Sequence, residues 1–146
     1  MTRRSDRLTV EVVFALPTRQ VLISLTVDSG TSVDEAIRLL RRTVPQDGTN
    51  MKAAYQVISS LNPAPDNVLL LVDGLPTMDS PEAARGMVTG QERLRYHYGA
   101  IETLPRGVPI NILLYPLEGD YSAAIAYWLL AYQTGGAFMS ISKDWP

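Results

Sequence analysis

The residues best placed to do chemistry are a carboxylate and a hydroxyl that flank apolar segments. Asp73 comes directly after the apolar run LLLV (69–72) and before Gly74, and Thr49 lies in the loop DGTN (47–50). A carboxylate and a hydroxyl at neighbouring strand ends suit a hard cation such as Mg²⁺, which takes oxygen ligands. The simpler interpretation is that Asp73 only ends a strand, because aspartate accepts backbone hydrogen bonds and glycine allows a sharp turn.

A pair of carboxylates in the turn EGD (118–120) raises the alternative of an enzyme. A paired-carboxylate hydrolase would need Glu118 and Asp120 placed across a cleft, whereas metal-dependent hydrolysis would use Asp73 and Asp120. The simpler role for Asp120 is to cap the N-terminus of the following helix. His97, the only histidine, has a tyrosine on each side and no accompanying serine or cysteine nucleophile motif. We interpret it as a surface histidine on a helix and expect no enzymatic activity.

Four large apolar residues recur at helical spacing near the C-terminus, namely Tyr121, Ile125, Trp128 and Tyr132. Such a stripe most simply packs into the core. The alternative is an exposed stripe that binds a partner.

The composition limits the class of protein. The chain has 146 residues, of which 46% are hydrophobic and 19% charged, as expected of one folded soluble domain. A net charge of -2 argues against nucleic-acid binding. The absence of cysteine excludes disulfides, zinc–thiolate sites and cysteine nucleophiles. No signal peptide is visible and no apolar run approaches the roughly 18 residues of a membrane helix, so we expect a cytoplasmic protein without membrane contact.

The hydrophobic pattern predicts an α/β fold. Residues 8–16 and 20–27 read as strands of an antiparallel hairpin, followed by a helix whose capping-box residue is Ser32. Helices are then predicted over 51–61, 91–104 and 121–134, and strands over 68–72, 108–117 and 137–142. This alternation predicts a mostly parallel sheet of about five strands flanked by helices, with functional residues at the carboxyl ends of the strands.

Three regions follow from this pattern. Residues 1–7 read as a flexible N-terminus, 8–42 as a hairpin plus helix, and 43–146 as an α/β region. We expect the last two to form one compact domain, because 146 residues suit a single domain, and the best candidate boundary between them is residues 43–47.

Two stretches resemble one known family. PQDGTNMKAAYQVISSLNPAPDNVLLLVDGLPT (45–77) and GVPINILLYPLEGDYSAAIAYWLLAYQTGGAFMSISKDWP (107–146) resemble the C-terminal two-thirds of a von Willebrand factor A domain of bacterial type, over about residues 43–146. The shared features are the G-T loop, the apolar strand ending in D-G, the E-G-D turn, the Gly-Gly pair and the closing D-W-P. The resemblance implies a truncated doubly wound fold that binds a protein partner without catalysis.

In that family a metal-ion-dependent adhesion site is built from three loops, and the partner protein adds a carboxylate to the cation. The resemblance implies that Thr49 supplies the second loop's hydroxyl and Asp73 the third loop's carboxylate. The first loop's D-x-S-x-S is absent; the nearest stretch, DSGTS (28–32), has the wrong spacing, so Asp28 and Ser32 are only speculative ligands. The expected site is incomplete and binds Mg²⁺ or Mn²⁺ weakly.

The N-terminal stretch resembles a different family. VEVVFALPTRQVLISLTVDSGTSVDEAIRLL (10–40) is similar to the start of the RnfH family, small ubiquitin-like proteins of the β-grasp fold. Two accounts compete: an A domain that lacks its first strand and helix, or a β-grasp beginning joined to most of an A domain. A composite chain without evolved activity is a third. A missing first strand would leave an open sheet edge, which favours homodimerisation.

Overall fold

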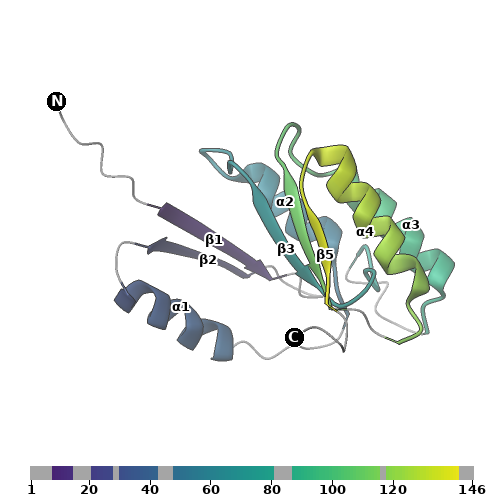
Figure 1. The fold of residues 1–146 in the computed structure, drawn as a ribbon, viewed down its shortest axis with the longest axis horizontal. Helices are drawn as coiled ribbons and strands as arrows, with labels where there is room; N and C mark the ends of the chain where they lie inside the picture. Colours follow the sequence, from purple (N-terminus) through teal and green to yellow (C-terminus); the bar gives the residue numbers. More distant parts are fainter. Residues whose placement is uncertain are drawn as a thin grey trace.

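The computed structural model describes residues 8–14, 21–27, 30–42, 48–80, 87–115 and 118–141. Its strands and helices follow in the order β1 (Leu8–Phe14), β2 (Val21–Val27), α1 (Gly30–Arg42), α2 (Met51–Ser60), β3 (Val68–Val72), α3 (Gly90–Ile101), β4 (Ile110–Leu114), α4 (Tyr121–Thr134) and β5 (Phe138–Ser140). Figure 1 shows the hairpin and α1 on one side of this arrangement and α3 and α4 on the other.

The predicted α/β class is confirmed. Strands β3, β4 and β5 form a parallel sheet with β4 in the middle, and Val68 to Val72 pair in register with Ile110 to Leu114. The strands β1 and β2 form a separate antiparallel pair, from Leu8 opposite Val27 to Phe14 opposite Val21. The sequence predicted about five strands in one mostly parallel sheet. Among the described residues this sheet has three strands, and β3 is its edge because the hairpin pairs separately.

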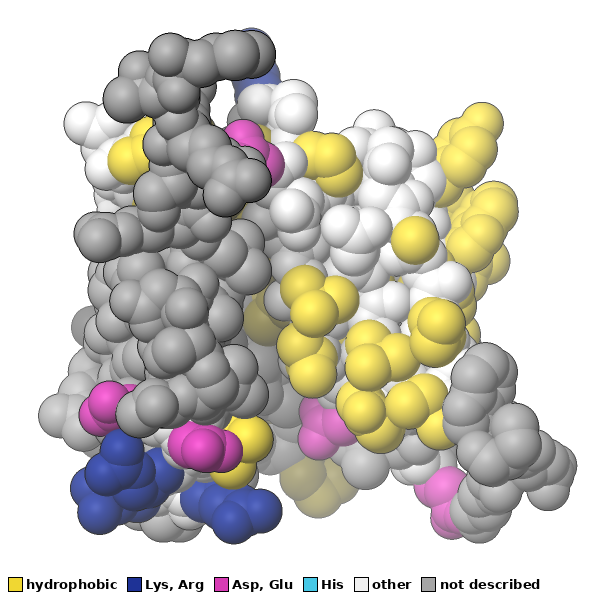
Figure 2. All heavy atoms as spheres, turned by 60° about the vertical axis from the view of Figure 1, so that its left-hand side comes forward, with side chains coloured by type: hydrophobic (Ala, Val, Ile, Leu, Met, Phe, Trp, Pro, Cys, Tyr) yellow, Lys and Arg dark blue, Asp and Glu magenta, His cyan; other side chains and the backbone are white. Residues whose placement is uncertain are grey.

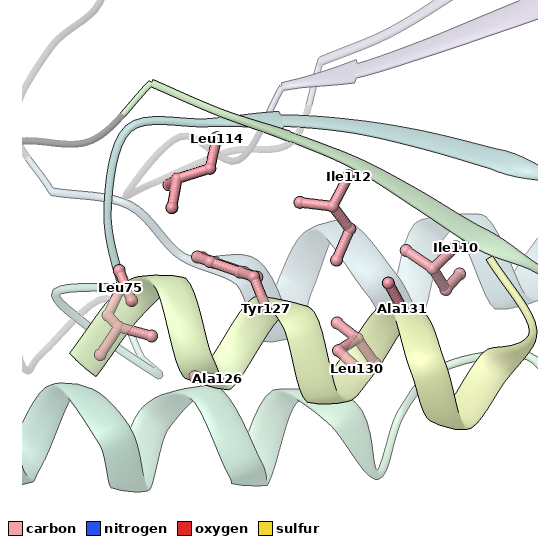
Figure 3. Close-up of a cluster of buried hydrophobic side chains, with 9 residues drawn as sticks. Leu75, Ile110, Ile112, Leu114, Ala126, Tyr127, Leu130 and Ala131 are labelled. Atoms are coloured by element: carbon pink, nitrogen blue, oxygen red, sulfur yellow. The ribbon is translucent and has the colours of Figure 1, made fainter. Parts of the chain in front are cut away.

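The core lies between one face of the sheet and the helices. Along β4 the side chains of Ile110, Ile112 and Leu114 are all buried, because alternate residues of a strand point to the same face. Tyr127 and Leu130 of α4 pack against them, as Figure 3 shows. Fully burying one such aliphatic side chain contributes about 1.5–3 kcal/mol, so this layer is the main source of stability in the α/β part.

The opposite face of the parallel sheet is open. Leu69 and Leu71 of β3 are 64% and 59% exposed, and Met139 of β5 is 51% exposed. Figure 2 shows hydrophobic side chains at the surface in the view that brings the hairpin side forward. Parallel sheets are usually covered by helices on both faces. In the described part of the chain, helices cover only one face of this sheet.

Helix α4 ends where the sequence predicts. Gly135 adopts the left-handed conformation, with φ 75°, and its N–H donates to carbonyls of the last helical turn. Glycine carries no penalty in this conformation, so the Gly-Gly pair stops the helix. The interpretation of the aromatic stripe on this helix as core packing is wrong: Tyr121, Ile125, Trp128 and Tyr132 are all exposed.

Helix starts show what local patterns can and cannot predict. Helix α1 begins at Gly30, so Ser32 lies inside its first turn and not at the N-cap. Helix α3 has a full capping box: Thr89 accepts a hydrogen bond from the backbone of Glu92, and the Glu92 side chain accepts one from the backbone of Thr89. The stretch TGQE (89–92) has the usual capping-box spacing.

Candidate functional site

Asp73 stands at the carboxyl end of β3 and is exposed. The three residues that follow it, Gly74, Leu75 and Pro76, are buried. The chain therefore turns inward immediately after the carboxylate, which leaves Asp73 at the rim of the sheet. This position agrees with the expectation that polar residues gather at the carboxyl ends of parallel strands.

The loop that carries Thr49 is tied to the loop that follows Asp73. The backbone N–H of Thr49 donates to Oγ1 of Thr77 at 2.8 Å. In return, the N–H groups of Thr77 and Met78 donate to the carbonyl oxygen of Thr49 at 3.2 and 3.3 Å. These three bonds hold the two loops at the same edge of the sheet.

Asp120 is occupied by structural contacts. One of its carboxylate oxygens, Oδ2, accepts a hydrogen bond from the N–H of Leu75 at 2.7 Å and lies 2.9 Å from a guanidinium nitrogen of Arg93. Its side chain is only 6% exposed. Asp120 holds the N-cap position of α4 but makes no side-chain capping bond, so the expected capping role is wrong.

Arg93 completes this arrangement from α3. Its Nε donates to the carbonyl oxygen of Leu75 at 3.2 Å, while the same side chain pairs with Asp120. The phenol of Tyr127 donates to the carbonyl oxygen of Gly74 at 2.9 Å. Side chains from α3, α4 and the turn before α4 therefore fix residues 74 and 75, the segment that directly follows Asp73. The role of Arg93 was not predictable from the sequence, because no local pattern links it to a carboxylate 27 positions away.

The surroundings keep Tyr127 in its protonated form. Burial raises its pKa well above the usual value, and the negative charges of Asp120 and Asp73 raise it further, while the Arg93 guanidinium acts in the opposite direction. A phenol held in this way remains a hydrogen-bond donor at neutral pH. Its role is to position Gly74.

His97 is buried, so its interpretation as a surface histidine is wrong. Its ring is 0% exposed and meets the Tyr127 ring edge-on, with centroids 4.9 Å apart. Among the described residues neither ring nitrogen has a hydrogen-bond partner. Burial lowers the pKa of His97 to about 4, and the backbone of Ala126 acts in the opposite direction.

This burial predicts a pH dependence of stability. The unfolded chain binds a proton at His97 near pH 6.5 and the folded chain only near pH 4, so acidification between these values favours unfolding, by at most about 3 kcal/mol. We expect His97→Phe to remove this loss. At pH 7 it should also be about 1–2 kcal/mol more stable, because no unpaired ring nitrogen stays buried. Urea unfolding of both proteins from pH 7 to pH 4 measures the difference; parallel stability curves would contradict it.

The predicted metal ligands are only partly brought together. Thr49 and Asp73 lie on loops that are hydrogen-bonded to each other. Asp28 lies outside the described residues, and Ser32 is described only as part of the α1 backbone. Within the described ranges no three His, Cys, Asp or Glu residues are grouped so as to hold a metal ion. One exposed carboxylate and one hydroxyl are oxygen ligands of the type that Mg²⁺ takes, but two groups would fill only part of its coordination shell.

Comparison with known families supports the N-terminal resemblance. The family described as RnfH family Ubiquitin matches residues 8–55, about a third of the chain. The match covers β1, β2 and α1 and runs into the first half of α2, beyond the thirty or so residues noted in the sequence. No curated protein and no solved structure matches the chain. In the part of the chain that the structure describes, no helix is long and apolar enough to cross a membrane.

Proposed function

We propose that this chain is a non-catalytic protein-binding module of the von Willebrand A type, with an incomplete metal-ion-dependent adhesion site at the carboxyl edge of its parallel sheet. The observation that supports this proposal is the unequal state of two aspartates at that edge. Asp120 is buried in an ion pair, whereas the carboxylate of Asp73 is exposed. Asp73 is therefore the group available to a cation or a partner.

The chemistry of the edge favours binding over hydrolysis. Metal-dependent hydrolysis would use Asp73 and Asp120 together. Asp120 already accepts from the N–H of Leu75 and neutralises Arg93, so using it for catalysis would leave both partners without their acceptor. The buried His97 offers no accessible base.

The resemblance supplies the form of the proposed interaction. Asp73 and the hydroxyl of Thr49 would hold Mg²⁺ or Mn²⁺ weakly, and a carboxylate of a partner protein would complete the shell. Magnesium parts with its waters reluctantly, so two protein ligands give little affinity by themselves. The partner's carboxylate would then contribute a large share of the binding free energy. The affinity for the cation would therefore depend on the presence of the partner.

The test is thermal unfolding of the chain in EDTA and in millimolar Mg²⁺ or Mn²⁺. A ligand that binds only the folded state stabilises it by about 2.7 kcal/mol at one hundred times its dissociation constant. For a weak site we expect a smaller rise of the midpoint, abolished in Asp73→Ala. Asp66→Ala is the matched control, because Asp66 is also exposed and lies before β3, at the other end of the strand.

Each outcome separates the alternatives. A rise that disappears only in Asp73→Ala directs the search toward carboxylate-bearing protein partners. No rise in the unmodified chain refutes the metal-dependent part and favours the third account, a composite of an RnfH-like beginning and an α/β remainder without evolved activity. The separate hydrogen-bonding of the hairpin and the parallel sheet gives that account its support.

A further inference from the structure

The outward face of α4 carries an apolar seam formed by Tyr121, Ile125, Trp128 and Tyr132. Their side chains are 91%, 61%, 49% and 74% exposed. The rings of Trp128 and Tyr132 are stacked, with centroids 5.7 Å apart and planes 13° from parallel. Exposed aromatic residues of this size, gathered on one face of one helix, are typical of interaction surfaces.

The seam has the spacing of a coiled coil. Its members are separated by four, three and four residues, which is the alternation of apolar positions along the contact line of two paired helices. The inward face of α4 has a different and broader pattern, with Ala123, Ala126, Tyr127, Leu130 and Ala131 all buried. The inward face of α4 already packs into the core, so the apolar residues of the seam are not required for the folding of one chain.

The seam is also symmetric along the helix. An antiparallel copy centred between positions 126 and 127 brings Tyr121 opposite Tyr132 of the second helix and Ile125 opposite Trp128. All four contacts are then apolar. We propose that a second copy of this chain covers the seam, through antiparallel packing of α4 against α4 about a two-fold axis. Such self-complementary contacts are the usual basis of dimers.

Charge supports this occupant. The fourteen residues YSAAIAYWLLAYQT contain no charged side chain, so two copies can approach without like-charge repulsion. A partner recognised by charge would find no complement on this helix. This inference does not depend on the proposed cation site at Asp73.

The area is sufficient for a specific but modest dimer. Each of the three aromatic side chains offers roughly 150–250 Å², and with the smaller Ile125 the four exposed fractions give about 500–600 Å² for each copy. The pair would bury about 1,000–1,200 Å², at the lower end of specific interfaces. We therefore expect a concentration-dependent equilibrium between monomer and dimer.

Sedimentation velocity over a range of protein concentrations tests the dimer. We expect Trp128→Ser to raise the dimer dissociation constant by at least about tenfold, because the residue is lost from both halves of the interface. Tyr115→Ser is the matched control, because Tyr115 is equally exposed (47%) but lies outside α4. A chain that stays monomeric at all concentrations, or a dimer that Trp128→Ser leaves unchanged, overturns the proposal.

Cysteine crosslinking tests the register, since the chain has no cysteine of its own. Tyr121→Cys mixed with Tyr132→Cys should give a mixed disulfide under mild oxidation. Neither variant should crosslink to itself, because equivalent positions would lie roughly 16 Å apart along the helices, beyond the reach of a disulfide. Gln56→Cys, exposed on α2, measures random collision. Self-crosslinking of Tyr121→Cys above that background would overturn the antiparallel arrangement.

Discussion

Gly136→Ala should be the most destabilising small substitution in the α/β part of this protein. An added Cβ would lie 2.0 Å from the carbonyl oxygen of Ile110 and 2.4 Å from its carbonyl carbon. Ile110 begins the central strand and is fully buried, and the Gly136 N–H is bonded to Ala131 at 2.9 Å. The backbone at Ile110 cannot move without breaking hydrogen bonds of the parallel sheet, and the backbone at Gly136 cannot move without breaking the hydrogen bond that closes α4. We expect a loss of about 3 kcal/mol or more, measured by urea unfolding.

Gly99→Ala is the matched control for this substitution. Gly99 lies inside α3, and an added Cβ would meet no atom within 4 Å. Alanine has the higher helix propensity, so this variant should gain about 0.5–1 kcal/mol. A loss below about 1 kcal/mol in Gly136→Ala would contradict this prediction, because it would mean that the connection between α4 and β5 shifts easily to accommodate the added Cβ.

These two glycines mark the limit of what the sequence predicts. The Gly-Gly pair after a helical run predicted the end of α4 correctly, because a left-handed residue is a local requirement. The contact of Gly136 with Ile110 joins positions 26 residues apart, and it depends on how closely β5 approaches β4. Local patterns carry no information on such a distance. The bounds of β3 and α4 were likewise predicted to the residue, since hydrophobic periodicity is a local property.

Exposure was harder to predict than secondary structure. The spacing of Tyr121, Ile125, Trp128 and Tyr132 fixes one face of α4, but α4 is apolar on both faces. The buried face of α4 is the one with three alanines and Tyr127, because small side chains let the helix approach the sheet closely. His97 was likewise predicted to be exposed. The buried Tyr127 ring packs against it instead.

The placement of Asp73 and Thr49 at one edge of the sheet was predictable, but the contacts around them were not. The strand-end location of Asp73 and its neighbouring loop with Thr49 follow from α/β topology, and the hydrogen bonds between the two loops agree with it. The roles of Asp120 and Arg93 were not predictable, because they depend on the packing of α3 beside α4. That packing removes Asp120 from the set of available carboxylates.

Asp120→Ala should cost about 2–4 kcal/mol of unfolding free energy. It leaves the N–H of Leu75, a residue 1% exposed, without its acceptor. It also leaves the Arg93 guanidinium, whose side chain is 20% exposed, without its carboxylate. An unpaired buried donor and a partly buried unpaired charge are each costly. Asp66→Ala, which changes an exposed aspartate, should stay within about 0.5 kcal/mol of the unmodified chain.

A double-mutant cycle with Arg93→Met tests whether Asp120 acts through this pair. Arg93→Met alone leaves a carboxylate that is 6% exposed without its cation, so it should also destabilise. Removing both residues leaves no unpaired charge, and the double variant should lose less than the two single variants together, by about 1–3 kcal/mol. Strict additivity would mean that the two residues stabilise the segment after Asp73 independently. The same variant is a control for the proposed stabilisation by Mg²⁺ or Mn²⁺. Arg93→Met retains the Asp73 carboxylate, so it should reduce that stabilisation only to the extent that residues 74 and 75 become disordered.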